Sequence, residues 1–86
     1  MPRYTILLAP SAERDLAALD KPVLRRVAAR IDALAENPRP SGVKKLQGDA
    51  NTWRLRAGDY RIIYTIEDNR LVILVVKIGH RREVYR

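Results

Sequence analysis

The chain has 86 residues, of which 47% are hydrophobic and 31% are charged, so we predict a single domain over residues 1–86. A domain this small buries only roughly 60% of its unfolded surface, which leaves little volume for a deep cavity and favours chemistry on a surface. The chain has no cysteine and one histidine, which excludes disulfides, zinc–thiolate sites, thiol nucleophiles and multi-histidine metal sites. We therefore expect no metal and no cofactor.

Basic residues are in excess and unevenly placed. Lys and Arg number 17 against 10 Asp and Glu, a formal net charge of +7. Residues 1–38 carry six basic and five acidic residues, whereas residues 39–86 carry eleven and five. This pattern predicts a polyanionic partner that contacts the second half of the chain. The early apolar run, residues 6–9, is too short for a signal peptide, and no run approaches the ~20 residues of a membrane span, so we expect a cytoplasmic protein with no membrane partner.

The first half of the chain predicts one strand and two helices. Residues 3–8 are rich in β-branched, aromatic and aliphatic side chains and end before a proline, as a strand would. Ser11 is the predicted N-cap of a helix that runs to about Asp20. A second helix is predicted to follow, because apolar residues then recur at helical spacing: Leu24, Val27, Ala28, Ile31, Leu34 and Ala35. Residues 37–42 cannot continue it, and the two helices are predicted to form a hairpin.

The second half of the chain has the period of strands. Residues 53–56 and 60–66 alternate in polarity, with turn residues between them, which indicates a β-hairpin. Residues 71–76 are apolar at both parities, as in a central strand that is covered on both faces. The order predicts an α+β fold. It consists of an N-terminal strand, a helical hairpin and a three-stranded antiparallel meander, with the helices packed on one face of a four-stranded sheet.

The predicted hairpin places arginines on one face. With Gly58 and Asp59 as the loop residues, Arg56 lies directly opposite Arg61. One face is then apolar, with Trp53, Leu55, Ile62 and Tyr64, and the other carries Arg54, Arg56 and Arg61. Arginines directly opposite each other repel, but a bound phosphate would accept charge-assisted hydrogen bonds from both. We therefore predict an anion-binding face. Two lysines of the preceding loop either extend it or are simply solvated: Lys44 and Lys45.

The end of the chain is a second basic region. A bulge at Gly79 is possible, so alternation leaves open which of three residues faces the arginines, although we expect at least one to do so: His80, Arg81 and Arg82. His80 is the only side chain of the sequence that normally titrates near neutral pH, which makes it either a candidate general acid or base or a surface histidine at a strand end. Tyr85 either packs on the sheet or stacks on a base beside a phosphate-binding face.

These segments together resemble the RelE/ParE superfamily of toxins from bacterial type II toxin–antitoxin systems, and the RelE branch in particular. The resemblance covers essentially the whole chain. It rests on residues 11–16, 36–38, 45–48, 53–64 and 78–85. The last two stretches are specific in combination.

The resemblance implies a ribosome-dependent mRNA interferase, which enters the vacant A site of the 30S subunit, next to rRNA, and cleaves the mRNA codon. It also implies a cognate antitoxin that silences the toxin. Operator DNA would be bound only by the complex with this antitoxin. In that family the activity is carried by residues that match Arg54, Arg61, Arg81 and Tyr85. Where members of the family often carry lysine, this chain has Thr52 and Arg54. Because arginine stays protonated, it is a poor general base. This makes His80 a stronger candidate for the residue that moves protons.

A metal-independent endoribonuclease needs no protein nucleophile, because the 2′-hydroxyl of the RNA attacks the adjacent phosphate. The protein has to stabilise the transition state, orient the attack and move two protons. The predicted catalytic residues are Arg61, Arg81, His80 and Tyr85, and the predicted RNA-binding residues are Arg54, Arg56, Lys44, Lys45 and Arg82. Two alternatives stay open: a ParE-like DNA gyrase poison without ribonuclease activity, and a non-catalytic basic RNA-binding module.

Overall fold

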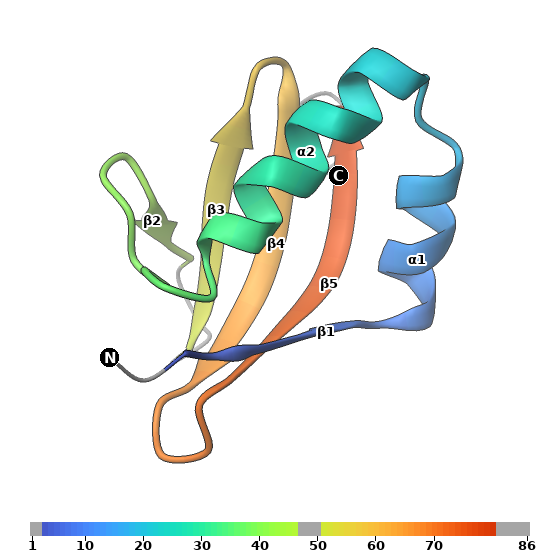
Figure 1. Ribbon diagram of the computed structural model, residues 1–86. Helices are drawn as coiled ribbons and strands as arrows, with labels where there is room; N and C mark the ends of the chain where they lie inside the picture. Colours follow the sequence, from blue (N-terminus) through green and yellow to red (C-terminus); the bar gives the residue numbers. More distant parts are fainter. Residues whose placement is uncertain (1–2, 47–50, 81–86) are drawn as a thin grey trace.

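A computed structural model describes residues 3–46 and 51–80 (Figure 1). The elements of this part of the chain are β1 (Thr5–Leu8), α1 (Pro10–Ala17), α2 (Lys21–Ala33), β2 (Lys44–Lys45), β3 (Thr52–Ala57), β4 (Tyr60–Glu67) and β5 (Val72–His80). They form one sheet in the order β1-β5-β4-β3-β2. β1 is parallel to β5, and the other neighbours are antiparallel. The predicted α+β class and the antiparallel meander are confirmed.

The sheet has five strands in the described ranges, and the predicted count of four was wrong. The additional strand is β2, in which Lys44 pairs with Arg54 and Lys45 pairs with Trp53. A strand of two lysines has no apolar alternation, so the sequence carries no signal for it. β2 covers only the first part of β3, and the edge of β3 beyond Arg54 has no neighbouring strand in the described structure.

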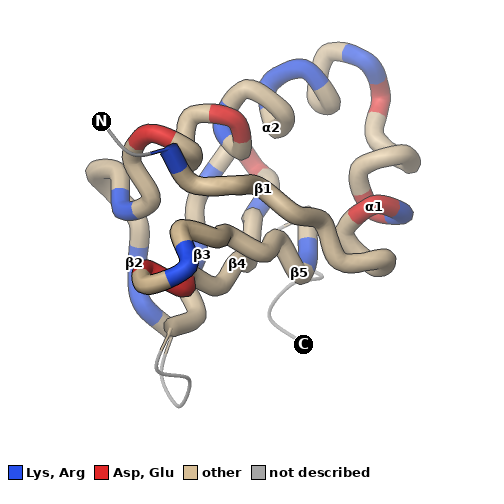
Figure 2. The backbone as a smooth tube through the Cα atoms, turned by 60° about the horizontal axis from the view of Figure 1, so that its bottom comes forward, with Lys and Arg blue, Asp and Glu red and all other residues tan. Residues whose placement is uncertain are grey.

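Both helices contribute to one core on a single face of the sheet, as predicted (Figures 1 and 2). α1 packs mainly against β5, whereas α2 crosses β3 and β4, so the helices contact different strands rather than forming a closed hairpin. The core residues of the helical layer are Ala12, Val27, Ile31 and Leu34, and those of the strands are Leu55, Ala57, Ile62, Tyr64, Ile66, Ile73, Val75 and Ile78. The opposite face carries no helix in the described part of the chain, and we call it the open face.

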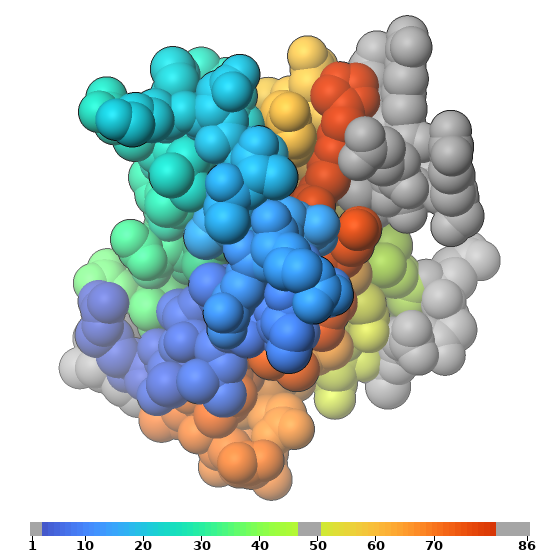
Figure 3. Space-filling view, turned by 90° about the vertical axis from the view of Figure 1, so that its right-hand side faces the viewer, coloured from blue at the N-terminus to red at the C-terminus, as the bar shows by residue number. Residues whose placement is uncertain are grey.

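α1 covers the edge of β5 with two polar side chains (Figure 3). Its N-cap is Ala9, so the prediction of Ser11 as the N-cap was wrong. The Ser11 hydroxyl instead donates to the carbonyl of Val76 at 2.8 Å, and the Asp15 carboxylate accepts the backbone N–H of Ile78 at 3.0 Å. These β5 residues lie beyond the end of β1. α1 therefore satisfies edge groups that a neighbouring strand would otherwise bind.

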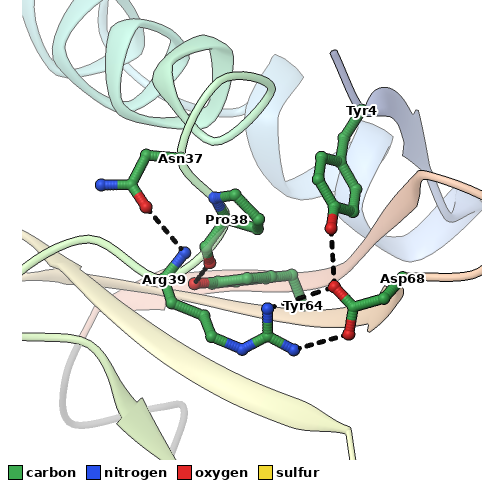
Figure 4. Close-up of polar contacts among 6 residues, drawn as sticks. All are labelled: Tyr4, Asn37, Pro38, Arg39, Tyr64 and Asp68. Atoms are coloured by element: carbon green, nitrogen blue, oxygen red, sulfur yellow. Dashed lines mark hydrogen bonds and ion pairs between the residues drawn. The ribbon is translucent and has the colours of Figure 1, made fainter. Parts of the chain in front are cut away.

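A polar network holds the loop after α2 against the sheet (Figure 4). Asp68, in the β4–β5 turn, accepts hydrogen bonds from the Tyr4 hydroxyl at 2.6 Å and from the two Nη atoms of Arg39 at 3.2 and 2.8 Å. The Tyr64 hydroxyl donates to the carbonyl of Pro38 at 2.7 Å. The network joins β1, the loop and the end of β4, which are distant in sequence.

The Asp68 network is expected to make the stability of the fold depend on pH in the acidic range. Hydrogen bonds from Arg39 and then Tyr4 lower the pKa of Asp68 to about 2, below the value of about 3.9 expected in the unfolded chain. The stabilisation is therefore present above pH ~4 and is lost as the pH falls towards 2. We expect urea midpoints to fall more steeply over this range for the wild type than for Asp68→Asn. Parallel pH profiles of the two proteins would contradict this expectation.

Candidate nucleic-acid interface

The register of the β3–β4 hairpin is the predicted one. Arg56 pairs with Arg61, Arg54 pairs with Ile63, and the other pairs also agree. Directly opposite residues of antiparallel strands point to the same face. The three arginines therefore share the open face, while the apolar side of the hairpin, which includes Leu55, joins the core.

Arg61 is buried, although the sequence predicted it only to lie on the arginine face. It is 7% exposed and is the one buried charged residue in the described ranges. Its Nη1 donates to the carbonyl of Tyr60 at 3.4 Å. Its direct partner on β5 is Gly79, and a glycine leaves space on the sheet surface for a neighbouring group to approach. Arginine stays charged and is rarely buried. Burial of Arg61 therefore fixes a positively charged guanidinium group at this position.

The other basic residues of this region divide between the two faces. Lys44 pairs with Arg54 and extends the open face, as predicted. Lys45 pairs with Trp53 on the helix face, and its Nζ lies 5.9 Å from the centre of the indole ring. The sequence left open whether the two lysines extend the arginine face or are solvated. Lys44 lies on that face and Lys45 does not, because adjacent strand residues point to opposite faces.

Lys77 was not predicted as part of the site. It pairs with Ile63 and so belongs to the open face. Its Nζ lies 3.4 Å from the Asp15 carboxylate, which neutralises part of its charge. Counting by two from Gly79 places Lys77 on this face, but only once the pairing of Gly79 with Arg61 is known from the structure.

His80 lies away from the arginines. It pairs with Tyr60 on the helix face, and the two ring centres are 5.6 Å apart with an interplanar angle of 83°. Both rings line a cleft of about 200 Å³ together with Asp15 and Leu19 of the helical layer. The sequence allowed a bulge at Gly79; the irregularity between β4 and β5 falls between Ile63 and Tyr64. The structure therefore does not bring His80 to Arg61, and the prediction that it serves there as proton carrier has no geometric support.

The remaining predicted site residues, Arg81, Arg82 and Tyr85, lie outside the described residues. The described open face thus brings together Arg54, Arg56, Arg61 and Lys44, which come from β2, β3 and β4. In the described ranges, Lys44 and Arg56 have no acidic side chain within ion-pair distance. The positive charges of Lys44 and Arg56 are therefore available to an anion.

Comparison with known proteins identifies the family. Residues 6–85 match the family described as the ParE toxin of the type II toxin–antitoxin system, parDE. The chain belongs to this toxin family. Two curated toxins show which members it resembles. It is 30% identical to toxin RelG of Mycobacterium tuberculosis, over 96% of this chain and 97% of that one. It is 33% identical to a putative RelE-like toxin protein of Escherichia coli, over 92% of this chain and 84% of that one.

A solved structure supports the same assignment. The RelE-like toxin superposes on a chain of the archaeal RelE–RelB complex of Pyrococcus horikoshii with a TM-score of 0.83 and 30% identity, over 94% of this chain and 98% of that one. The predicted membership of the RelE-like toxins is confirmed. Neither α1 nor α2 has the length and apolar character that crossing a bilayer requires, and they are the helices of the described ranges.

Proposed function

We propose that this RelE-like toxin is a ribosome-dependent mRNA interferase that cleaves mRNA in the A site of the 30S subunit. The observation that carries the proposal is the buried Arg61, opposite Gly79 on a face that also carries Arg54, Arg56 and Lys44. An RNA phosphate is the anion that suits such a face, because guanidinium groups bind it with directed, charge-assisted hydrogen bonds. Ribosome-bound mRNA implies that the toxin acts in the cytoplasm.

The chemistry requires no metal and no protein nucleophile. The 2′-oxygen of the RNA forms a bond to the adjacent phosphorus, the bond from phosphorus to the 5′-oxygen breaks, and the products are a 2′,3′-cyclic phosphate and a 5′-hydroxyl. The 2′-hydroxyl loses a proton and the leaving 5′-oxygen gains one. Arg61 donates to the oxygens of the transferring phosphate, whose negative charge increases in the transition state. Arg54, Arg56 and Lys44 hold the neighbouring phosphates.

Residues near the C-terminus complete the proposed site. Arg81 follows Gly79 by two positions in the sequence, and we assign it to the same phosphate as Arg61. Tyr85 stacks on a base, and Arg82 adds a phosphate contact. The contribution of the basic side chains of the described open face to the reaction is electrostatic. His80 has no role in this scheme.

Primer extension on ribosome-bound message tests the proposal. The purified toxin is added to ribosomes stalled with a vacant A site, and we expect new 5′ ends within the A-site codon. A matched message with 2′-deoxynucleotides at that codon lacks the attacking hydroxyl and is expected to stay intact. The absence of new ends, or equal cutting of the deoxy-substituted message, would refute the proposed chemistry.

A second candidate function is poisoning of DNA gyrase without RNA cleavage. The description of the matching family, which names the ParE toxin, is the observation that favours it. A supercoiling assay with purified gyrase separates the two. Inhibition of supercoiling by a toxin that produces no ends on ribosome-bound message would establish the gyrase function in place of the interferase.

The proposed partner for silencing is a cognate antitoxin. The similar archaeal chain was solved in a RelE–RelB complex, and a toxin of net charge +7 suits an acidic segment that folds on binding. Operator DNA would then be contacted only through the antitoxin.

A further inference from the structure

α2 carries three cations that have no acidic partner in the described ranges. Arg25, Arg26 and Arg30 lie on its exposed side, and we call them the α2 arginine row. Arg26 and Arg30 are one helical turn apart, where like charges are unfavourable. No acidic side chain in the described ranges lies within ion-pair distance of any of the three. In contrast, Arg3, Arg39, Arg70 and Lys77 each have an acidic partner.

The α2 arginine row continues the positive charge of the open face around the edge of β3. Arg30 Nε donates to the carbonyl of Arg56 at 3.3 Å. A Cβ atom at Gly58, which has a φ of +63°, would lie 3.0 Å from Arg26 Nη1. Both contacts fall where β2 no longer covers β3. The Arg56 side chain belongs to the open face, and its carbonyl accepts the hydrogen bond from Arg30 of α2. Basic side chains therefore extend continuously from the open face, around the edge of β3, to α2.

The composition of this surface favours a phosphate backbone over a protein. The exposed residues beside the row include the small side chains Ala29 and Ala33, and Leu7 on β1 is the one large hydrophobic residue that is well exposed in the described ranges, at 48%. Protein interfaces depend on buried apolar or aromatic anchors. Phosphate contacts require only positioned cations and carry no sequence information.

We infer that the α2 arginine row is a second RNA-binding surface, which holds the phosphate backbone of a folded RNA while the open face receives the strand to be cleaved. The inference rests on the proposed function in that the polyanion is RNA. The basic residues of the toxin then have two separate roles. A buried guanidinium acts at the scissile phosphate, and exposed guanidinium groups attach the toxin to the structured RNA around it.

Two double variants of equal charge test the inference. Arg25→Gln/Arg26→Gln removes two charges from the row, and the control Arg3→Gln/Arg70→Gln removes two exposed, ion-paired arginines from elsewhere. Binding to a fluorescent 2′-O-methyl RNA hairpin is measured by anisotropy from 50 to 300 mM KCl. We expect the row variant to lower the magnitude of the slope of log K against log [KCl] by about 1.5 to 2, since each phosphate contact contributes about 0.9. Its affinity at the lowest salt is expected to fall at least about tenfold, with the control within about twofold of wild type.

Equal losses in the two variants would show that only net charge matters and would overturn the inference. Unchanged RNA binding by the row variant, with weakened binding of a poly-glutamate peptide, would assign the surface to an acidic protein and also overturn it. The 2′-O-methyl hairpin has no cleavable linkage, so the result does not depend on catalysis. A reduced slope together with uncut ribosomal message would refute the proposed function and leave the second surface standing.

Discussion

Arg61→Ala is expected to lower the rate of mRNA cleavage on the ribosome by at least ~10²-fold. The loss of one preorganised donor to a developing oxyanion typically costs ~10² to 10³ in rate, and Arg61 is the one buried basic side chain of the described open face. Single-turnover primer extension with excess toxin measures the chemical step separately from binding.

Two further variants identify the cause of that loss. Arg61→Lys keeps the charge but not the planar fork of donors, and we expect it to recover only part of the rate. Arg56→Ala removes an exposed arginine directly across the strand pair, and we expect a decrease of no more than about tenfold. Unchanged urea midpoints and antitoxin binding show that Arg61→Ala folds. A folded Arg61→Ala protein that cleaves like the wild type would exclude the assigned role.

Tyr64→Ala is expected to destabilise the fold by about 3 to 5 kcal/mol, as other large aromatic truncations in cores do. Tyr64 is 0% exposed, and burial raises its pKa to about 12, so the ring and the neutral hydroxyl are both enclosed. Tyr64→Phe removes only the hydrogen bond to Pro38, and we expect a cost of about 1 kcal/mol. Urea denaturation followed by circular dichroism measures both values.

Tyr4→Phe is the matched control for the hydroxyl of Tyr64. It removes the hydrogen bond that a half-buried tyrosine makes to Asp68 at an exposed position, where water can replace that partner. We expect it to cost less than Tyr64→Phe. A larger cost for Tyr4→Phe, or a Tyr64→Ala protein as stable as the wild type, would mean that the core does not depend on Tyr64 in this way.

The β3–β4 hairpin could be predicted in detail because its determinants are local. The two loop residues fix the register, and the register determines that Arg54, Arg56 and Arg61 share a face. The core stripe of α2 is similarly local, since Val27, Ile31 and Leu34 recur at helical spacing.

The features that were not predicted depend on contacts between distant segments. The burial of Arg61 depends on what surrounds it in the folded protein, which alternation within β4 does not reveal. The side on which His80 lies depends on where the sheet irregularity falls, and alternation along the sequence does not determine that position. The pairing of Lys44 and Lys45 with β3 is likewise decided by tertiary structure, because two lysines have little intrinsic strand preference.

The way α1 covers β5 affects how the toxin behaves at high concentration. The central strand is strongly apolar over residues 71–76, and such segments promote cross-β aggregation when their backbone groups are accessible. Beyond β1, the side chains of Ser11 and Asp15 occupy the hydrogen-bonding positions that a strand from another molecule would need. The helix thus protects the edge of β5 beyond β1, on a strand that passes beside the arginine face.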